Sequence, residues 1–161
     1  VETWAPYELK VTAEGYHDHS WFGYNDGGGF STSGLIASTA ATALLSSALG
    51  LPLDSSKGHV VVTAYTYDGK SLSFYPGVTV AIDATYDIAL SQDSSTYGFS
   101  PGDVTAEQGA VVFANVPTGE VTPTISIPDD YDCFVFPGDE TSLTITVSAD
   151  SFSRMSFFCA K

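Results

Sequence analysis

The segment His17-Asp18-His19 holds the residue types best suited to binding a metal ion. On an extended backbone the side chains of residues i and i+2 point the same way, so both imidazoles can face one ion. Zinc and copper accept such a pair together with at least one further ligand. Candidates for that ligand are His59, Asp26, Asp129, Asp130 and Asp132. We predict a transition-metal site at His17, Asp18, His19 and Asp26. The alternative interpretation is a solvated polar loop, since His-x-His also arises by chance.

Clusters of carboxylates predict a different kind of metal site, because Ca²⁺ is a hard ion that prefers oxygen ligands. Asp129, Asp130 and Asp132 form one such cluster, and Asp93 and Asp103 lie in another polar stretch. No EF-hand spacing is present, and a solvated acidic loop is the alternative interpretation. The sequence thus identifies no certain cofactor and leaves Ca²⁺ or a transition metal as the predicted ions.

Aromatic residues surround the glycine run at 27–29, namely Tyr16, Trp21, Phe22, Tyr24 and Phe30. Exposed rings on a loop can stack on sugars, and we predict Trp21 and Tyr24 as ligand-binding residues. The alternative is that the rings close one end of a folded core, since a buried aromatic ring removes roughly 150–250 Å² from water. Residues 16–30 are where we expect any small ligand or ion to bind.

Catalytic motifs are absent: the sequence has no GxSxG, HExxH, Walker A or GxGxxG pattern. The 161 residues include 19 acids and only 5 bases, for a net charge of −14. Nucleic acids and anionic membranes are bound through clustered Lys and Arg, so neither is an expected partner. No apolar run is long enough to span a membrane. We predict a non-catalytic protein.

Two cysteines and the absence of a CxxC motif bear on the compartment. In an oxidising compartment Cys133 and Cys159 are expected to pair, whereas two buried free thiols are the alternative. The chain begins at Val1 and not at Met, as expected of a processed or trimmed chain, and a mature secreted chain would have lost its signal peptide. The predicted location is extracellular, periplasmic or cell-surface.

The residues around these candidates predict the elements that position them. Alternating apolar and polar residues predict a strand at 8–16, and the polar, Gly-rich residues 17–34 predict a loop. Residues 35–49 are the one predicted helix, with Ser33 capping its start and Gly50 marking its end.

From residue 58 onward, β-branched segments alternate with turn signals about every ten residues, which is typical of a β-sandwich. Asp68-Gly69 is a hairpin signal within 58–74. Further predicted strands are 78–84, 87–91, 110–117, 120–128, 141–150 and 152–161, and 92–109 is predicted to be a long loop. The predicted core comprises Val61, Val80, Ile82, Val112, Ile125, Ile127, Ile145 and Val147.

Two motifs in this region match a known pattern: PGVTVAI at 76–82 and GAVVFANVPTG at 109–119. With the two strands that follow, they make residues 58–159 resemble the carboxypeptidase regulatory-like, transthyretin-like β-sandwich domain. The resemblance implies a non-catalytic accessory domain, although fold alone does not determine function.

The predicted fold is mainly β, an Ig-like/transthyretin-like antiparallel β-sandwich with one short helix in an N-terminal extension. Residues 1–57 would form a strand, a Gly-rich loop and a helix packing on the sandwich of 58–161. The predicted function is a secreted structural or binding module whose partner is a protein, another copy of itself or a surface polysaccharide. Two alternatives stay open: a metal-binding protein or metalloenzyme using His17 and His19, and a carbohydrate-binding module using Trp21 and Tyr24.

Overall fold

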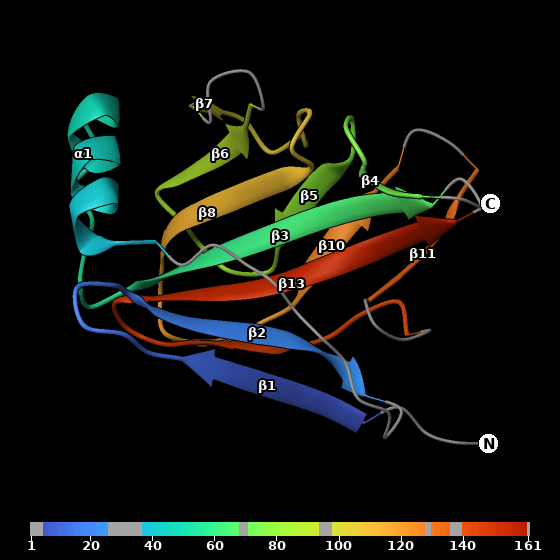
Figure 1. The fold of residues 1–161 in the computed structure, drawn as a ribbon, viewed down its shortest axis with the longest axis horizontal. Coiled ribbons are helices and arrows are strands. Elements are labelled where there is room, and N and C mark those ends of the chain that lie inside the picture. Colours follow the sequence, from blue (N-terminus) through green and yellow to red (C-terminus); the bar gives the residue numbers. More distant parts are fainter. Residues whose placement is uncertain are drawn as a thin grey trace.

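Strands dominate the computed structural model of this chain, which describes residues 5–25, 37–67, 71–93, 98–127, 130–135 and 140–160. Figure 1 shows one large twisted sheet with smaller sheets behind it and a helix at one end. Within the described ranges, no helix is long and apolar enough to cross a membrane.

Nine strands form the large sheet. They are β1 Ala5–Val11, β2 Asp18–Asn25, β3 Gly58–Tyr67, β4 Leu72–Phe74, β6 Ile88–Gln92, β7 Phe99–Pro101, β8 Ala110–Val116, β11 Asp132–Val135 and β13 Ser151–Ala160. Their spatial order is β1-β2-β13-β3-β8-β6-β7, with β11 also paired to β13 and β4 also paired to β3.

Strand β13 lies in the interior of this sheet, between β2 and β3, and runs parallel to both. It pairs with β2 over residues 151–154 and with β3 over residues 152–160. The other described strand pairs are antiparallel. The prediction of a mainly-β sandwich with one short helix is therefore confirmed. The sandwich departs from the predicted antiparallel pairing at one strand, because β13 inserts between two strands of its own direction.

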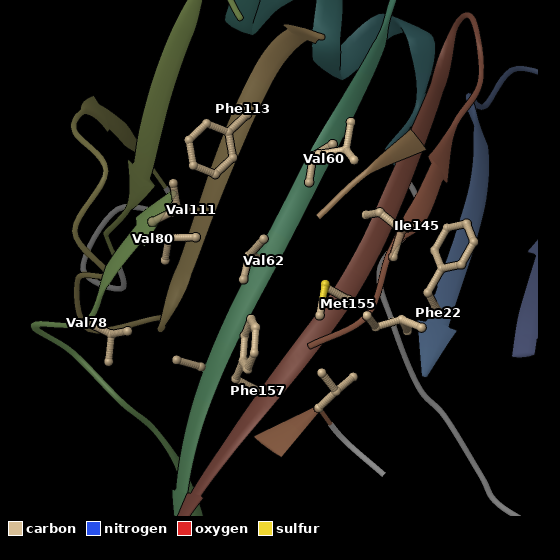
Figure 2. Close-up of a cluster of buried hydrophobic side chains, with 14 of the residues drawn as sticks. Phe22, Val60, Val62, Val78, Val80, Val111, Phe113, Ile145, Met155 and Phe157 are labelled. Carbon is tan, nitrogen blue, oxygen red and sulfur yellow. The ribbon is translucent and has the colours of Figure 1, made fainter. Parts of the chain in front are cut away.

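Two small sheets close the sandwich core. β5 Thr79–Ile82 pairs with β10 Pro123–Ser126, and β9 Gly119–Val121 pairs with β12 Ile145–Val147. Between them and the large sheet lies a cluster of buried side chains, shown in Figure 2, that includes Phe22, Val60, Val62, Val80, Val111, Phe113, Ile145, Met155 and Phe157. Burial of this apolar surface is the main stabilising term of a two-layer fold.

Alternation along the strands gives the large sheet an inner face toward this core and an opposite face, here called the outer face. Of the predicted core residues, Val80, Ile145 and Val147 are buried in the core. Val61 is buried as well but points to the outer face, since Val60 and Val62 take the inner one. The remaining members of the predicted core, Ile82, Val112, Ile125 and Ile127, are half-buried.

Helix α1, Thr39–Leu49, stands at one end of the outer face (Figure 1). Its predicted end is confirmed: Gly50 adopts the left-handed conformation, φ 64°, and its N–H bonds back to the last helical turn. The predicted start is wrong, because the N-cap is Ser38, whose hydroxyl accepts from the N–H of Ala41. Ser33 and residues 35–36 lie outside the described residues, as does the side chain of Leu45.

Backbone contacts with the segment before β2 explain why the helix begins so late. The N–H of His17 bonds to the carbonyl of Ala37, and the N–H of Thr39 bonds to the carbonyl of Gly15. Tyr16 and Ser38 form an isolated β-bridge between these two bonds. Residues 37 and 38 are thereby held extended, so the helix starts only at Thr39.

The predicted boundaries of the N-terminal elements also change. β1 ends at Val11 and not at residue 16, and residues 18–25 form β2 where a loop was predicted. The N-terminal strands are not a separate layer: β1 pairs with β2, and β2 pairs with β13, so they continue the large sheet. The glycine run at 27–29, Phe30 and the Asp68-Gly69 turn lie outside the described residues.

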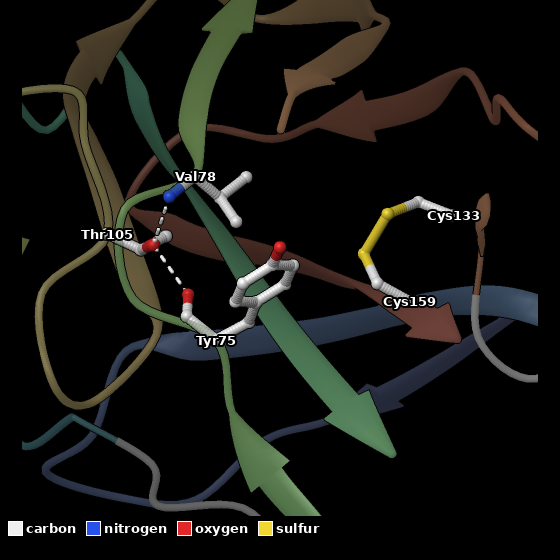
Figure 3. The surroundings of a disulfide bond; sticks show 5 residues. All are labelled: Tyr75, Val78, Thr105, Cys133 and Cys159. Atoms are coloured by element: carbon white, nitrogen blue, oxygen red, sulfur yellow. Dashed lines mark hydrogen bonds between the residues drawn. A yellow bond between two sulfur atoms is a disulfide. The ribbon is translucent and has the colours of Figure 1, made fainter. Parts of the chain in front are cut away.

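A disulfide joins Cys133 and Cys159, which confirms the predicted pair (Figure 3). The two residues are direct partners in the β11–β13 ladder, with Cα atoms 4.1 Å apart. Figure 3 also shows the Thr105 hydroxyl accepting from the N–H of Val78 at 2.9 Å and donating to the carbonyl of Tyr75 at 2.6 Å. Thr105 thus holds the turn that leads into β5.

Candidate functional site

All three histidines of the chain meet around one aromatic ring on the outer face. His17 precedes β2, His19 lies on β2, His59 lies on β3, and Phe152 lies between them on β13. The ring centroids of these histidines lie 5.5, 5.0 and 4.7 Å from that of Phe152, respectively. We call these four residues the histidine cluster. All of its members are buried, because helix α1 covers this end of the sheet.

Both ring nitrogens of His17 are engaged in hydrogen bonds. Its Nδ1 lies 2.9 Å from a carboxylate oxygen of Asp150, and its Nε2 lies 2.6 Å from the hydroxyl of Thr42 on α1. Asp150 itself has a positive φ of 51°, which is uncommon for a residue with a side chain. His17 therefore connects the turn before β13 to the helix.

His19 and His59 each accept a hydrogen bond from a backbone N–H. Nε2 of His19 accepts from Ala37 at 2.9 Å, and Nδ1 of His59 accepts from Asn115 at 3.2 Å. A backbone amide is a donor only, so each ring must present an unprotonated nitrogen there. Both rings are therefore neutral. Burial lowers the pKa of each to about 4, with the charge of Arg154 adding to the effect at His19 and that of His17 at His59.

This arrangement places the three histidines around the hydrocarbon ring of Phe152. Among the described residues there is no group of three or more His, Cys, Asp or Glu side chains that could hold a metal. Asp18 pairs instead with Lys10 at 3.0 Å, and Asp26 lies outside the described residues. The metal site at His17, Asp18, His19 and Asp26 stays a prediction, as does Ca²⁺ binding.

The predicted ligand-binding aromatics lie on β2. Trp21 is only 9% exposed, and its ring stacks on that of His19 with the guanidinium of Arg154 6.0 Å from its centre. Tyr24 is half-buried, and its hydroxyl donates to the carbonyl of Ser142 at 2.9 Å. A sugar would have to displace these neighbours before it could stack on either ring. Ligand binding at Trp21 and Tyr24 stays a prediction.

Asp150, His17 and Thr42 have the hydrogen-bond order of an acid–base–hydroxyl triad. Thr42 is buried beside an apolar pocket that lies between α1 and the outer face, where Leu49 and Leu90 are two of the lining residues. Acyl transfer also needs N–H donors aimed at the developing oxyanion.

The helix N–H groups nearest to Thr42 are already bonded within the helix. Those of Ala41 and Thr42 donate to the hydroxyl and the carbonyl of Ser38, respectively. The Thr42 hydroxyl also lies within hydrogen-bonding distance of the carbonyls of Ser38 and Thr39. Asp150, His17 and Thr42 therefore form a hydrogen-bonded chain that holds α1 against the sheet.

Asn115 is a structural centre that sequence reasoning treated only as part of a motif. It is buried with φ 56°; its amide donates to the carbonyl of Pro52 and the carboxylate of Asp87, and its side-chain oxygen accepts from the N–H of Asp54. Lys57 reaches the same carboxylate at 3.4 Å. The group holds the segment after α1 against β8. Its signal in the sequence was an Asn before Val-Pro, since Asn is the residue besides Gly that most readily takes a positive φ.

No protein-family model and no curated protein sequence matches the chain. Among solved structures it is similar to the minor pilin GBS52 of Streptococcus agalactiae, with a TM-score of 0.46, 11% identity, and coverage of 66% of this chain and 45% of that one. It is also similar to a streptococcal ancillary pilin, with a TM-score of 0.42, 11% identity and coverage of 97% and 45%. A pilus-presented adhesin gives a TM-score of 0.41 at 8% identity, covering 69% and 28%.

The chain spans less than half the length of each of these proteins. At TM-scores below 0.5 and identities near 10%, the likenesses assign no partner or activity to this chain.

Proposed function

We propose that this chain is a secreted, non-catalytic β-sandwich module with a structural or adhesive role in an extracellular or cell-surface assembly. One observation carries the proposal: the histidines, which are the side chains best suited to metal binding or catalysis, are buried, and each forms a hydrogen bond within the fold. His17, His19 and His59 use ring nitrogens to hold α1, the segment before it and β8. Histidines whose ring nitrogens bond to other parts of the fold in this way stabilise that fold.

The disulfide supports the proposed compartment. Cys133 and Cys159 lie opposite one another on adjacent strands and are bonded, and such structural disulfides persist in oxidising environments. The net charge of −14 also suits a module outside the cell, because like charges discourage non-specific association with other copies of the chain.

Two motif segments support a finer assignment to the carboxypeptidase regulatory-like, transthyretin-like group. Val78 and Val80 of the first motif are fully buried in the core, as are Phe113 and Val116 of the second. The burial of these motif residues supports this assignment, and the group's accessory role agrees with the proposed function.

The test uses cells that make the chain naturally. Intact cells are treated with a lysine-reactive label that cannot cross membranes, and the chain is then extracted under alkylating conditions that preserve thiols and disulfides. We expect a labelled chain in which both cysteines are oxidised. A chain that stays unlabelled until the cells are lysed and carries two free thiols would overturn the proposal.

A further inference from the structure

Strand β1 is the longest edge strand of the large sheet. It is the terminal strand in the sheet order and forms the lower border of the sheet in Figure 1. Its seven residues pair with β2 without a register shift, and no described strand pairs with its other side. The opposite border, β7, has only three residues. A long, regular edge offers a row of backbone donors and acceptors to another strand.

We propose that β1 pairs antiparallel with β1 of a second copy of this chain, with Leu9 facing Leu9 of the copy across a two-fold axis. This inference rests on the proposed function, because it names one contact of the assembly. The two sheets would then join into one continuous sheet. An isologous contact of this kind closes on itself and ends at the dimer.

The charges of β1 select this register. With Leu9 on the axis, Glu8 of each copy lies opposite Lys10 of the other, so opposite charges face each other twice. Centring the pair on Glu8 would oppose two carboxylates, and centring it on Lys10 would oppose two ammonium groups. Like charges directly opposite in a sheet are destabilising, whereas opposite charges stabilise it.

The side-chain faces agree with the same register. Tyr7, Leu9 and Val11 share the outer face with Trp21 and His19, as their pairing with β2 requires. In the proposed pair, Tyr7 lies opposite Val11 of the copy, and the outer face continues unbroken. Leu9, which is 38% exposed in the single chain, becomes covered at the centre. A shift by one residue would place apolar side chains opposite charged ones.

Both charged residues can take a further partner. Glu8 accepts from the hydroxyl of Ser20 at 2.6 Å through one carboxylate oxygen, and its other oxygen can accept again. Lys10 pairs with Asp18 at 3.0 Å, and its ammonium has three donors. Both residues are exposed. Pro6 lacks an N–H and limits the ladder to residues 7–11, so the contact is short.

The experiment compares the native chain with Glu8→Lys and Lys10→Glu by sedimentation equilibrium at up to about 1 mM. We expect the native chain to dimerise. Each variant opposes like charges twice, so its dissociation constant should rise about tenfold or more. An equimolar mixture of the two variants restores opposite charges in both pairs and should associate as tightly as the native chain. A monomeric native chain, unaltered variants or a mixture that does not recover would each overturn the proposal.

A cross-linking variant tests the register independently of charge. The described residues contain no free cysteine, so Leu9→Cys introduces a thiol that meets its own copy at the axis. Mild oxidation should give a covalent dimer. The matched control is Leu44→Cys, since Leu44 is 74% exposed on α1, away from the edge. Equal cross-linking by both variants, or none by Leu9→Cys, would overturn the proposal.

The two proposals can fail separately. A chain at the cell surface whose association ignores β1 would overturn the edge contact and leave the proposed function standing. A chain confined to the cell interior would overturn the function, whatever β1 does in solution.

Discussion

Gly109 lies where β3 changes its partner from β8 to β4. Its φ is 59°, and its carbonyl accepts from the N–H of Ala64 at 2.7 Å. A Cβ at this position would lie 2.6 Å from the carbonyl oxygen of Ala64 and 3.0 Å from the side chain of Phe74. Gly109→Ala should therefore lower the free energy of unfolding by about 3 kcal/mol, since left-handed strain adds to a backbone clash.

Gly15 is the matched control for this prediction. Its φ is 80°, but a Cβ there would meet nothing within 4 Å. Gly15→Ala should cost only the conformational part, about 1–2 kcal/mol. Urea unfolding of both variants measures the difference. Equal losses of unfolding free energy in the two variants would show that a Cβ at position 109 does not clash with Ala64.

Asn115 offers a second test at the residue scale. Asn115→Gly removes the side-chain bonds to Asp54, Pro52 and Asp87 but tolerates the positive φ, whereas Asn115→Ala loses both advantages. Both variants should be destabilised by several kcal/mol, because buried bonds are lost. The alanine variant should be worse by about 1 kcal/mol, owing to left-handed strain. An alanine variant as stable as the glycine one in chemical denaturation would contradict the backbone conformation.

At the scale of elements, β3 and β13 each pair with two different strands along the same edge. β3 pairs with β8 over residues 58–63 and with β4 over 65–67, while β13 pairs with β2 over 151–154 and with β11 over 157–160. The short strands β4 and β11 therefore contribute few ladder bonds. At β11, the Cys133–Cys159 disulfide adds a covalent link to β13 that strengthens this short pairing.

Removing the disulfide should show how much β11 depends on it. The double change Cys133→Ala with Cys159→Ala opens a loop with a sequence separation of 26. On the chain-entropy relation this costs about 3.5 kcal/mol of unfolding free energy. Calorimetry of the variant and of the reduced native chain should give similar losses. Two thiols in the unreduced, unfolded native chain would show that the bond is not formed.

The elements that could be predicted from sequence are those with local signals. The end of α1 at Gly50 and most strands from residue 58 onward follow from turn residues and β-branched runs. The prediction of a loop over 92–109 is wrong, because Phe99–Pro101 pair with β6 as β7, and the four-residue β11 was not predicted. β2 could not be predicted, because it carries rings on both faces and so shows no period-two pattern. Trp21 and His19 point outward, while Phe22 and Tyr24 point inward. Its parallel pairing with β13 is a contact between distant segments.

The sequence predicts that His17 and His19 belong to one site, but it does not predict which residues surround them. That His17 and His19 share a direction follows from strand geometry, and both do approach one residue. That residue is Phe152, which no local pattern connects to them. Thr42 and Asp150, the partners of His17, are likewise distant in sequence. The disulfide was predictable because only two cysteines exist.

For the whole molecule, the neutral histidines predict a loss of stability in mild acid. The pKa of His19 and of His59 is about 4 in the folded chain and about 6.5 when unfolded. As pH falls from about 6.5 to 4, the unfolded chain binds protons that the folded chain does not, so the free energy of unfolding falls. Asp54 and Asp87, whose pKa values are lowered by hydrogen bonds, add their loss only below about pH 4.

Urea midpoints measured from pH 7 to 4.5 check this expectation, together with NMR titration of the imidazole C2 protons. We expect falling midpoints and no titration of the His19 and His59 signals above pH 5 in the folded chain. A midpoint of titration near 6.5 for either ring would contradict the bonds to Ala37 and Asn115.

The central position of β13 also has a consequence in time. β13 is the last strand of the described chain, yet β2 and β3 meet only through it. Until residues 151–160 have been made, the β1–β2 pair has no described strand that joins it to the rest of the large sheet. The large sheet can therefore close only once β13 is available, and contacts this distant along the chain form slowly. Because this joining strand is made after the other described strands, the sheet stays open until β13 has been synthesised.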